Sequence, residues 1–113
     1  MTDPSILVAE KIVANPTNAP EAISYQDGAV VSKEILKTPG ATVTLFAFDI
    51  GQGLSEHSTP FNALVQVIDG EAEIIIDNIS YLVKINEMII MPANHPHALK
   101  ANKRFKMLLT MTR

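Results

Sequence analysis

Residues 51–70 read GQGLSEHSTPFNALVQVIDG, and residues 86–100 read NEMIIMPANHPHALK. Each of these two stretches carries a histidine next to turn-forming residues and an alternating apolar run. Side chains along a β-strand point alternately to its two faces. If the two stretches form neighbouring strands of one barrel, His57 and His97 point into the same cavity. The interior of that barrel is therefore the candidate site for chemistry.

The chain has the size and composition of one globular domain. It contains 113 residues, of which 47% are hydrophobic and 19% charged, so it can bury a single core. It has no cysteine, so a bound metal would need histidine, carboxylate or water as ligands. Neither a signal peptide nor an apolar run of membrane-spanning length is present, which predicts a cytoplasmic protein without a membrane partner.

The charge pattern argues against a nucleic-acid partner. The net charge is −3. The only basic cluster comprises Lys100, Lys103, Arg104 and Lys106. So few positive side chains cannot neutralise a run of phosphates, and we expect them to lie on a solvated surface.

Short segments rich in β-branched and aromatic residues follow one another after Gly28 and predict an all-β domain. The expected strands are Ala29–Leu36, Ala41–Asp49, Ala63–Ile68, Glu71–Ile76, Ile79–Ile85, Glu87–Met91, Pro96–Lys100 and Arg104–Met111. The expected turns are Thr38-Pro39-Gly40, Asp69-Gly70 and Asp77-Asn78. Residues 29–113 then form a barrel, and residues 1–28 form an N-terminal arm in which residues 6–8 and 12–13 are compatible with a short helix or an added strand.

Period-two alternation assigns the faces of these strands. It places Glu71 and Glu73 outside, and Ala72, Ile74 and Ile76 inside. Phe105, Met107, Leu109 and Met111 share one face of the last strand. Three apolar side chains fall on outer faces, Leu64, Ile75 and Leu108. Because such residues need cover, and because the apolar arm can pack on a partner as well as on its own barrel, we expect a homodimer.

The positions of several residues in the two histidine stretches resemble the two motifs of small single-domain cupins. In the first motif Gly51, His57 and Gly70 are in register. In the second motif Asn86, Pro92, Asn94 and His97 keep the spacing, with asparagine at both glycine positions. Asparagine is the residue other than glycine that most readily adopts the left-handed backbone conformation of a tight turn. The resemblance covers residues 29–113 and implies a small cupin double-stranded β-helix, or jelly-roll barrel.

The resemblance also implies a metal site, of which this chain keeps a part. Cupins typically bind a divalent metal through two or three histidines and a glutamate, and His57 and His97 are the two ligands that remain. Thr59 stands at the second histidine position and Ala63 at the glutamate position. The implied cofactor is a divalent transition metal, Zn, Fe, Mn, Ni or Cu, held by His57 and His97 with water. Alternatively, both histidines are polar residues of the barrel without a metal.

Four further residues are candidates for the lining of the cavity: Thr59, Ala63, Val65 and Met107. An apolar pocket with a small polar end suits a small organic ligand. The sequence therefore predicts a barrel that binds a small molecule, with a weakly held metal. A metal-dependent enzyme of the dioxygenase or isomerase type is the alternative, and a sugar epimerase with His57 as base ranks last because no inward carboxylate is evident. His95, between Asn94 and Pro96, is expected at the solvent-exposed rim.

Overall fold

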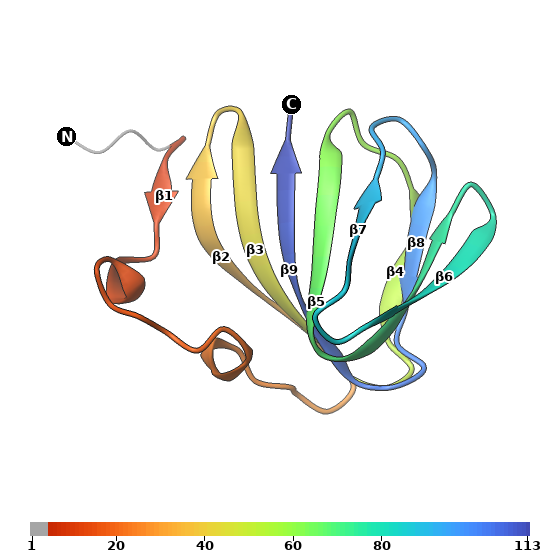
Figure 1. The fold of residues 1–113 in the computed structure, drawn as a ribbon, viewed down its shortest axis with the longest axis horizontal. Coiled ribbons are helices and arrows are strands. Elements are labelled where there is room, and N and C mark those ends of the chain that lie inside the picture. The colour runs from red at the N-terminus through yellow and green to blue at the C-terminus, as the bar shows by residue number, and fades with distance from the viewer. Residues whose placement is uncertain (1–4) are drawn as a thin grey trace.

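The computed structural model describes residues 5–113, most of which form β-strands (Figure 1). The strands are β1 Leu7–Val8, β2 Val30–Thr38, β3 Ala41–Phe48, β4 Gly53–His57, β5 Asn62–Ile76, β6 Ile79–Lys84, β7 Met88–Met91, β8 His97–Lys100 and β9 Phe105–Thr112. The helical segments are two short 3₁₀ turns, η1 Glu10–Ile12 and η2 Pro20–Ala22. No helix among residues 5–113 is long and apolar enough to cross a membrane. The all-β prediction is confirmed.

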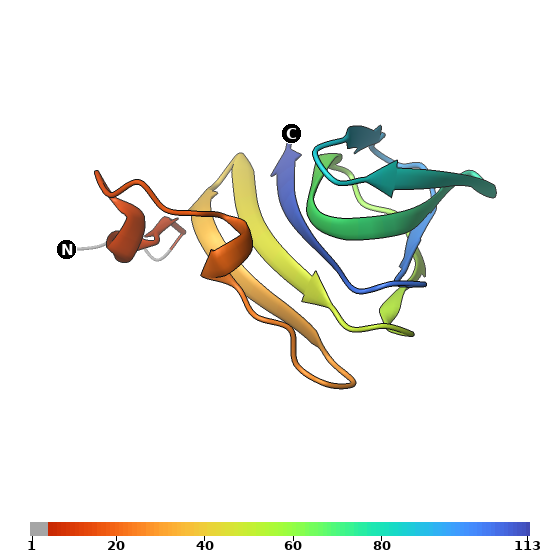
Figure 2. The same cartoon turned by 60° about the horizontal axis from the view of Figure 1, so that its bottom comes forward.

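Strand β5 is shared by the two layers of the barrel. The order of strands is β1-β2-β3-β9-β5-β8-β4, and β6 and β7 also pair with β5. The first half of β5 pairs with β9 and β7, and its second half pairs with β6 and β8. Figure 2 shows how the strands curve around the space that their inner side chains fill. The fully buried residues between the layers include Phe48, Val65, Val67, Ile74, Leu99, Phe105 and Met107.

The turn predicted at Asp69-Gly70 is wrong, because β5 runs through both residues without a break. Gly70 has a φ of 68°, and the pairing of β5 with β9 shifts register between Val67 and Asp69. These features are those of a β-bulge, in which one extra residue bends a strand. The extra residue, Ile68, reverses the alternation, so that Val67 and Ala72 both face the core although their numbers differ in parity.

The other special turns are as predicted. Asp77 and Asn78 both have positive φ values, 51° and 65°, as a two-residue hairpin turn requires. Asn86 and Asn94, which occupy glycine positions of the motifs, have φ values of 68° and 66°. The exchange of glycine for asparagine therefore preserves the left-handed backbone of both turns.

Alternation also assigned the faces of β5 and β9 correctly. Ala72, Ile74 and Ile76 are buried in the core, as are Phe105 and Met107. On the opposite side of β9, Leu108 packs in a second apolar cluster whose buried members are Ile23, Leu45, Ala47 and Ile68. The cover that Leu108 was expected to need thus comes partly from the arm of the same chain.

The sequence of the arm was compatible with a short helix or an added strand, and the arm contains a strand and a helical turn. Leu7–Val8 is an added strand that pairs with Leu36 and Lys37 of β2. Glu10–Ile12 is a 3₁₀ turn, and the arm then follows the outer face of β2 and β3 (Figure 2). Residues 1–4 lie outside the described residues.

Candidate functional site

His57 and His97 face each other across two paired strands. The two residues are register partners of β4 and β8. Their ring centroids are 4.4 Å apart, and the ring planes make an angle of 68°. This is the juxtaposition that the motif spacing predicts.

A bulge in β4 produces this alignment. Leu54 is the register partner of Leu99, and the register shifts between Leu54 and His57. Residues that are directly opposite in an antiparallel pair point to the same face. The extra residue therefore lets His57 and Leu54 share one face, which strict alternation would forbid. Because this irregularity depends on β8, the sequence of β4 alone did not reveal it.

Both imidazole rings are held by backbone carbonyl groups. Nδ1 of His57 lies 2.7 Å from the carbonyl oxygen of Ser55, and Nδ1 of His97 lies 3.1 Å from that of His95. A carbonyl oxygen only accepts, so each Nδ1 must carry the proton and donate it. In the neutral rings, each Nε2 then has a free lone pair. The same arrangement orients histidines that bind metals in other proteins.

The two rings differ in their environment. His97 is 4% exposed, whereas His57 lies at the surface. Burial lowers the pKa of His97, and the neighbouring His57 acts in the same direction, while the hydrogen bond to His95 opposes them. His97 is therefore neutral at pH 7, and the pair opens to solvent on the side of His57.

The predicted lining residues fall into two groups. Ala63, Val65 and Met107 are buried members of the core between the two layers. Thr59 is half-buried in the link from β4 to β5, where its hydroxyl group lies 3.3 Å from both the amide nitrogen and the carbonyl oxygen of Phe61. The backbone N–H of Asn94 donates a hydrogen bond of 2.7 Å to the carbonyl oxygen of Thr59. This bond fastens the link to the turn before β8.

Sequence reasoning missed two residues beside the histidines, Ile79 and Tyr81. Ile79 and His97 are both register partners of Ile76, so Ile79, Ile76, His97 and His57 form one row across the inner face of four strands. Tyr81 pairs with the buried Ile74 and therefore shares that face. Ile79 and Tyr81 are 56% and 40% exposed, so the inner face of β6 offers accessible apolar surface one strand away from the strand that carries His97. The two-residue turn at Asp77-Asn78 fixes this register, so the signal was present in the sequence.

Comparison with solved structures shows which family has this architecture. A conserved protein of unknown function from Streptococcus pyogenes is 33% identical, with a TM-score of 0.86 over 89% of each chain. The cupin 2 conserved barrel domain protein from Leptotrichia buccalis is 38% identical over 88% of this chain, which spans 48% of that protein, with a TM-score of 0.85. A cupin superfamily protein from Desulfitobacterium hafniense is 26% identical, with a TM-score of 0.82 over 86% of this chain and 89% of the other.

The chain is a small cupin. Comparisons with protein-family models and with curated proteins gave no match. The assignment therefore rests on the structural relatives and on the two motif stretches, whose histidines His57 and His97 lie on β4 and β8.

The candidate metal ligands of this cupin are fewer than those of the full motif. Residues 5–113 contain no group of three or more histidine and acidic side chains that could hold a metal ion. His95, the third histidine, is an exposed rim residue, as expected, and its Nδ1 lies 2.7 Å from Asp77 Oδ2. His57 and His97 fit a transition metal as two oriented imidazole ligands, and their role as metal ligands stays a prediction.

Proposed function

We propose that this cupin binds a small organic molecule at the mouth of its barrel, where His57 and His97 meet the accessible faces of Ile79 and Tyr81. The observation that carries the proposal is the anchoring of both Nδ1 atoms on backbone carbonyls. It leaves two Nε2 atoms for a polar group of a ligand or for a metal. The apolar row beside them suits the carbon skeleton of the same ligand.

A weakly held divalent transition metal is part of the proposal. Zn, Fe, Mn, Ni and Cu all accept imidazole ligands. Two protein ligands bind such an ion less tightly than the three or four of a complete site, so water or ligand oxygen atoms would have to fill the remaining positions. The metal would then serve to bind and polarise an oxygen atom of the ligand.

A metal-dependent enzyme of the dioxygenase or isomerase type is the second candidate. The exposed side of His57 favours it, because a substrate could reach an ion held there. The epimerase hypothesis has less support. His57 would need a carboxylate partner to act as a base, and the hydrogen-bond partner of its Nδ1 is the carbonyl of Ser55.

Metal titration tests the proposed site. After removal of metal with a chelator, we expect the wild-type protein to bind Ni²⁺ or Zn²⁺ weakly in isothermal titration calorimetry. His57→Gln and His97→Gln should each lower the affinity about tenfold or more, because each removes one of two imidazole ligands. His95→Gln is the matched control, since it removes an imidazole outside the pair and should leave the affinity unchanged. Equal affinities for all four proteins would contradict the site.

We further propose that the protein is a homodimer. Leu64 and Ile90 are exposed register partners on the outer face of β5 and β7, and Met88 beside them is 69% exposed. Apolar surface of this kind commonly lies in an interface. Sedimentation at micromolar concentration should show a dimer, and Ile90→Glu should shift it toward monomer because it would bury a charge in the interface. A wild-type protein that sediments as a monomer would overturn this proposal.

A further inference from the structure

A groove of about 680 Å³ lies between the arm and the outer face of the sheet, on the opposite side of the strands from the barrel interior. Its floor is apolar and is formed by Ile35 of β2, Val43 and Leu45 of β3, and Leu108 of β9. Apolar residues of the arm, among them Ile12, line the other side. A volume between about 300 and 1,000 Å³ with mostly apolar walls is typical of small-molecule sites.

The arm crosses the sheet as an arch that is attached at both ends. At its start β1 pairs with β2, and the Ala9 amide donates a hydrogen bond of 2.9 Å to the carbonyl of Ile35. At its end Ile23 is buried in the second apolar cluster. The segment between these two attachments forms the roof of the groove.

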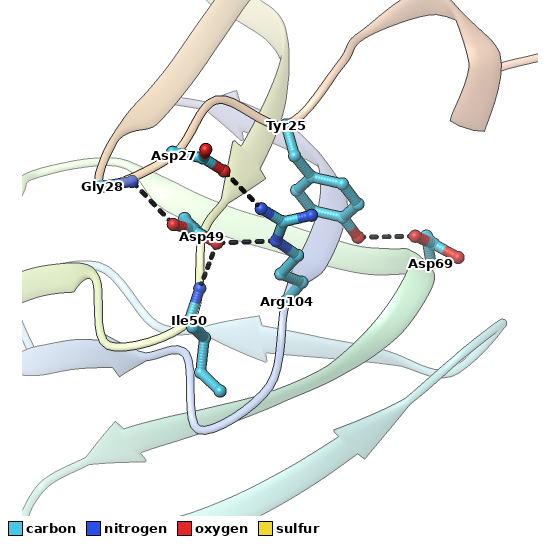
Figure 3. Close-up of polar contacts among 7 residues, drawn as sticks. All are labelled: Tyr25, Asp27, Gly28, Asp49, Ile50, Asp69 and Arg104. Atoms are coloured by element: carbon cyan, nitrogen blue, oxygen red, sulfur yellow. Dashed lines mark hydrogen bonds and ion pairs between the residues drawn. The ribbon is translucent and has the colours of Figure 1, made fainter.

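Polar contacts hold the far end of the arch (Figure 3). The Tyr25 hydroxyl group donates a hydrogen bond of 2.5 Å to Asp69, on the bulge of β5. Arg104 lies between Asp49 and Asp27, with nitrogen–oxygen distances of 2.6 and 2.9 Å. These contacts join the end of the arm to three separate parts of the barrel.

Asp49 keeps its charge in this arrangement. Its carboxylate accepts a hydrogen bond of 2.6 Å from the Gly28 amide. This bond, followed by that of Arg104, lowers the pKa of Asp49 to about 2. The ion pair therefore persists at neutral pH, and the contacts of Asp49 and Arg104 with Gly28 and Asp27 tie the end of the arm to the barrel before anything binds. A preformed site binds more tightly because less conformational entropy is lost on binding.

The rim of the groove determines which ligand suits it. The rim includes two basic residues, Lys11 and Lys33, and one acidic residue, Glu34. Among residues 5–113, Lys33 Nζ makes one hydrogen bond, a long one of 3.4 Å to the carbonyl of Ala22, and an ammonium group has three donors. The rim thus offers positive charge and unused donors at the edge of an apolar floor, which complements an anionic head group on an apolar chain.

We propose that this groove binds a small amphipathic carboxylate with an extended apolar body, such as a medium-chain fatty acid. Its hydrocarbon part would cover Ile35, Val43 and Leu108, and its carboxylate would pair with Lys33. This site is separate from the histidine pair and would be occupied independently of any metal.

Calorimetric titration with decanoate, below its micelle concentration, tests the proposal. We expect one decanoate per chain. Val43→Trp should lower the affinity about tenfold or more because the larger side chain fills the groove. Leu82→Trp, at an exposed apolar position of β6 outside the groove, is the matched control that should leave the affinity unchanged. Lys33→Glu should lower the affinity for decanoate about tenfold, since it removes a charge-assisted hydrogen bond, but should change that for decanol little.

Circular dichroism melting must show that each variant is folded. If Val43→Trp does not fold, the comparison of decanoate with decanol binding by Lys33→Glu still tests the proposal. His97→Gln should bind decanoate as the wild type does. Absence of binding at millimolar decanoate would overturn the proposal, as would loss of binding in His97→Gln with retention in Val43→Trp. If Val43→Trp instead converts a wild-type dimer into monomers, a second copy of the chain fills the groove and the proposal is wrong.

Discussion

Gly70→Ala is expected to destabilise the protein by at least ~4 kcal/mol, which is a large part of the roughly 5–15 kcal/mol that stabilises an ordinary domain. Two costs combine at this position. Gly70 has a φ of 68°, which an alanine adopts only with strain. A Cβ atom there would also overlap the carbonyl oxygen of Arg104, a backbone atom of the residue that immediately precedes the neighbouring strand β9. Neither strand can move without separating the pair that carries Phe105, which is fully buried.

Two other glycines separate these costs. Gly28 also has a φ of 68°, but nothing lies within 4 Å of the Cβ that it would carry, so Gly28→Ala should cost only the strain, about 1–2 kcal/mol. Gly40 has open space and no positive φ, and Gly40→Ala should be nearly neutral. The measurement is the free energy of unfolding in urea for all four proteins. If Gly70→Ala costs no more than Gly28→Ala, β5 and β9 are not in the close contact described above.

Thr59→His combined with Ala63→Glu should convert a weak metal site into a tight one. In the alignment with the cupin motifs, these two positions are those of the missing ligands. A complete set of four ligands reaches apparent binding energies of roughly 10 kcal/mol or more, so the affinity should increase by several orders of magnitude over the wild type. Isothermal titration with Mn²⁺, Zn²⁺ or Ni²⁺ measures the gain.

The single variant Ala63→Glu supplies the control. Ala63 is 1% exposed within the apolar core, so a glutamate there would bury an unpaired carboxylate and should destabilise the metal-free protein by several kcal/mol. Added metal should restore part of this loss in the double variant, which thermal melting would show. Equal, weak binding by the wild type and the double variant would mean that positions 59 and 63 do not face His57 and His97.

Much of the candidate site follows from local sequence rules. Alternation placed Ile74 and Ile76 inside, and the motif spacing brought His57 to His97. Ile79 and Tyr81 were within reach of the same reasoning, because a two-residue hairpin turn at Asp77-Asn78 fixes which residues of β5 and β6 are opposite each other. The orientation of the imidazole rings could not be predicted from the sequence, since it depends on which carbonyl oxygen accepts the hydrogen bond of each Nδ1.

Local sequence rules predict most of the strands, the turn at Asp77-Asn78 and the faces of regular segments, because turn preference and period-two alternation depend only on neighbouring residues. They miss strand β4, and they divide β5 at Asp69-Gly70. The bulges of β4 and β5 follow from strand pairing in the folded barrel. The pair Asp69-Gly70 suits a hairpin turn as well as a bulge, and the partner strand β9 selects the bulge by offering eight residues for β5 to pair with. For the same reason the path of the arm, and the groove beneath it, came only from the structure: they depend on Tyr25, Asp69 and Arg104, which meet across a large separation in sequence.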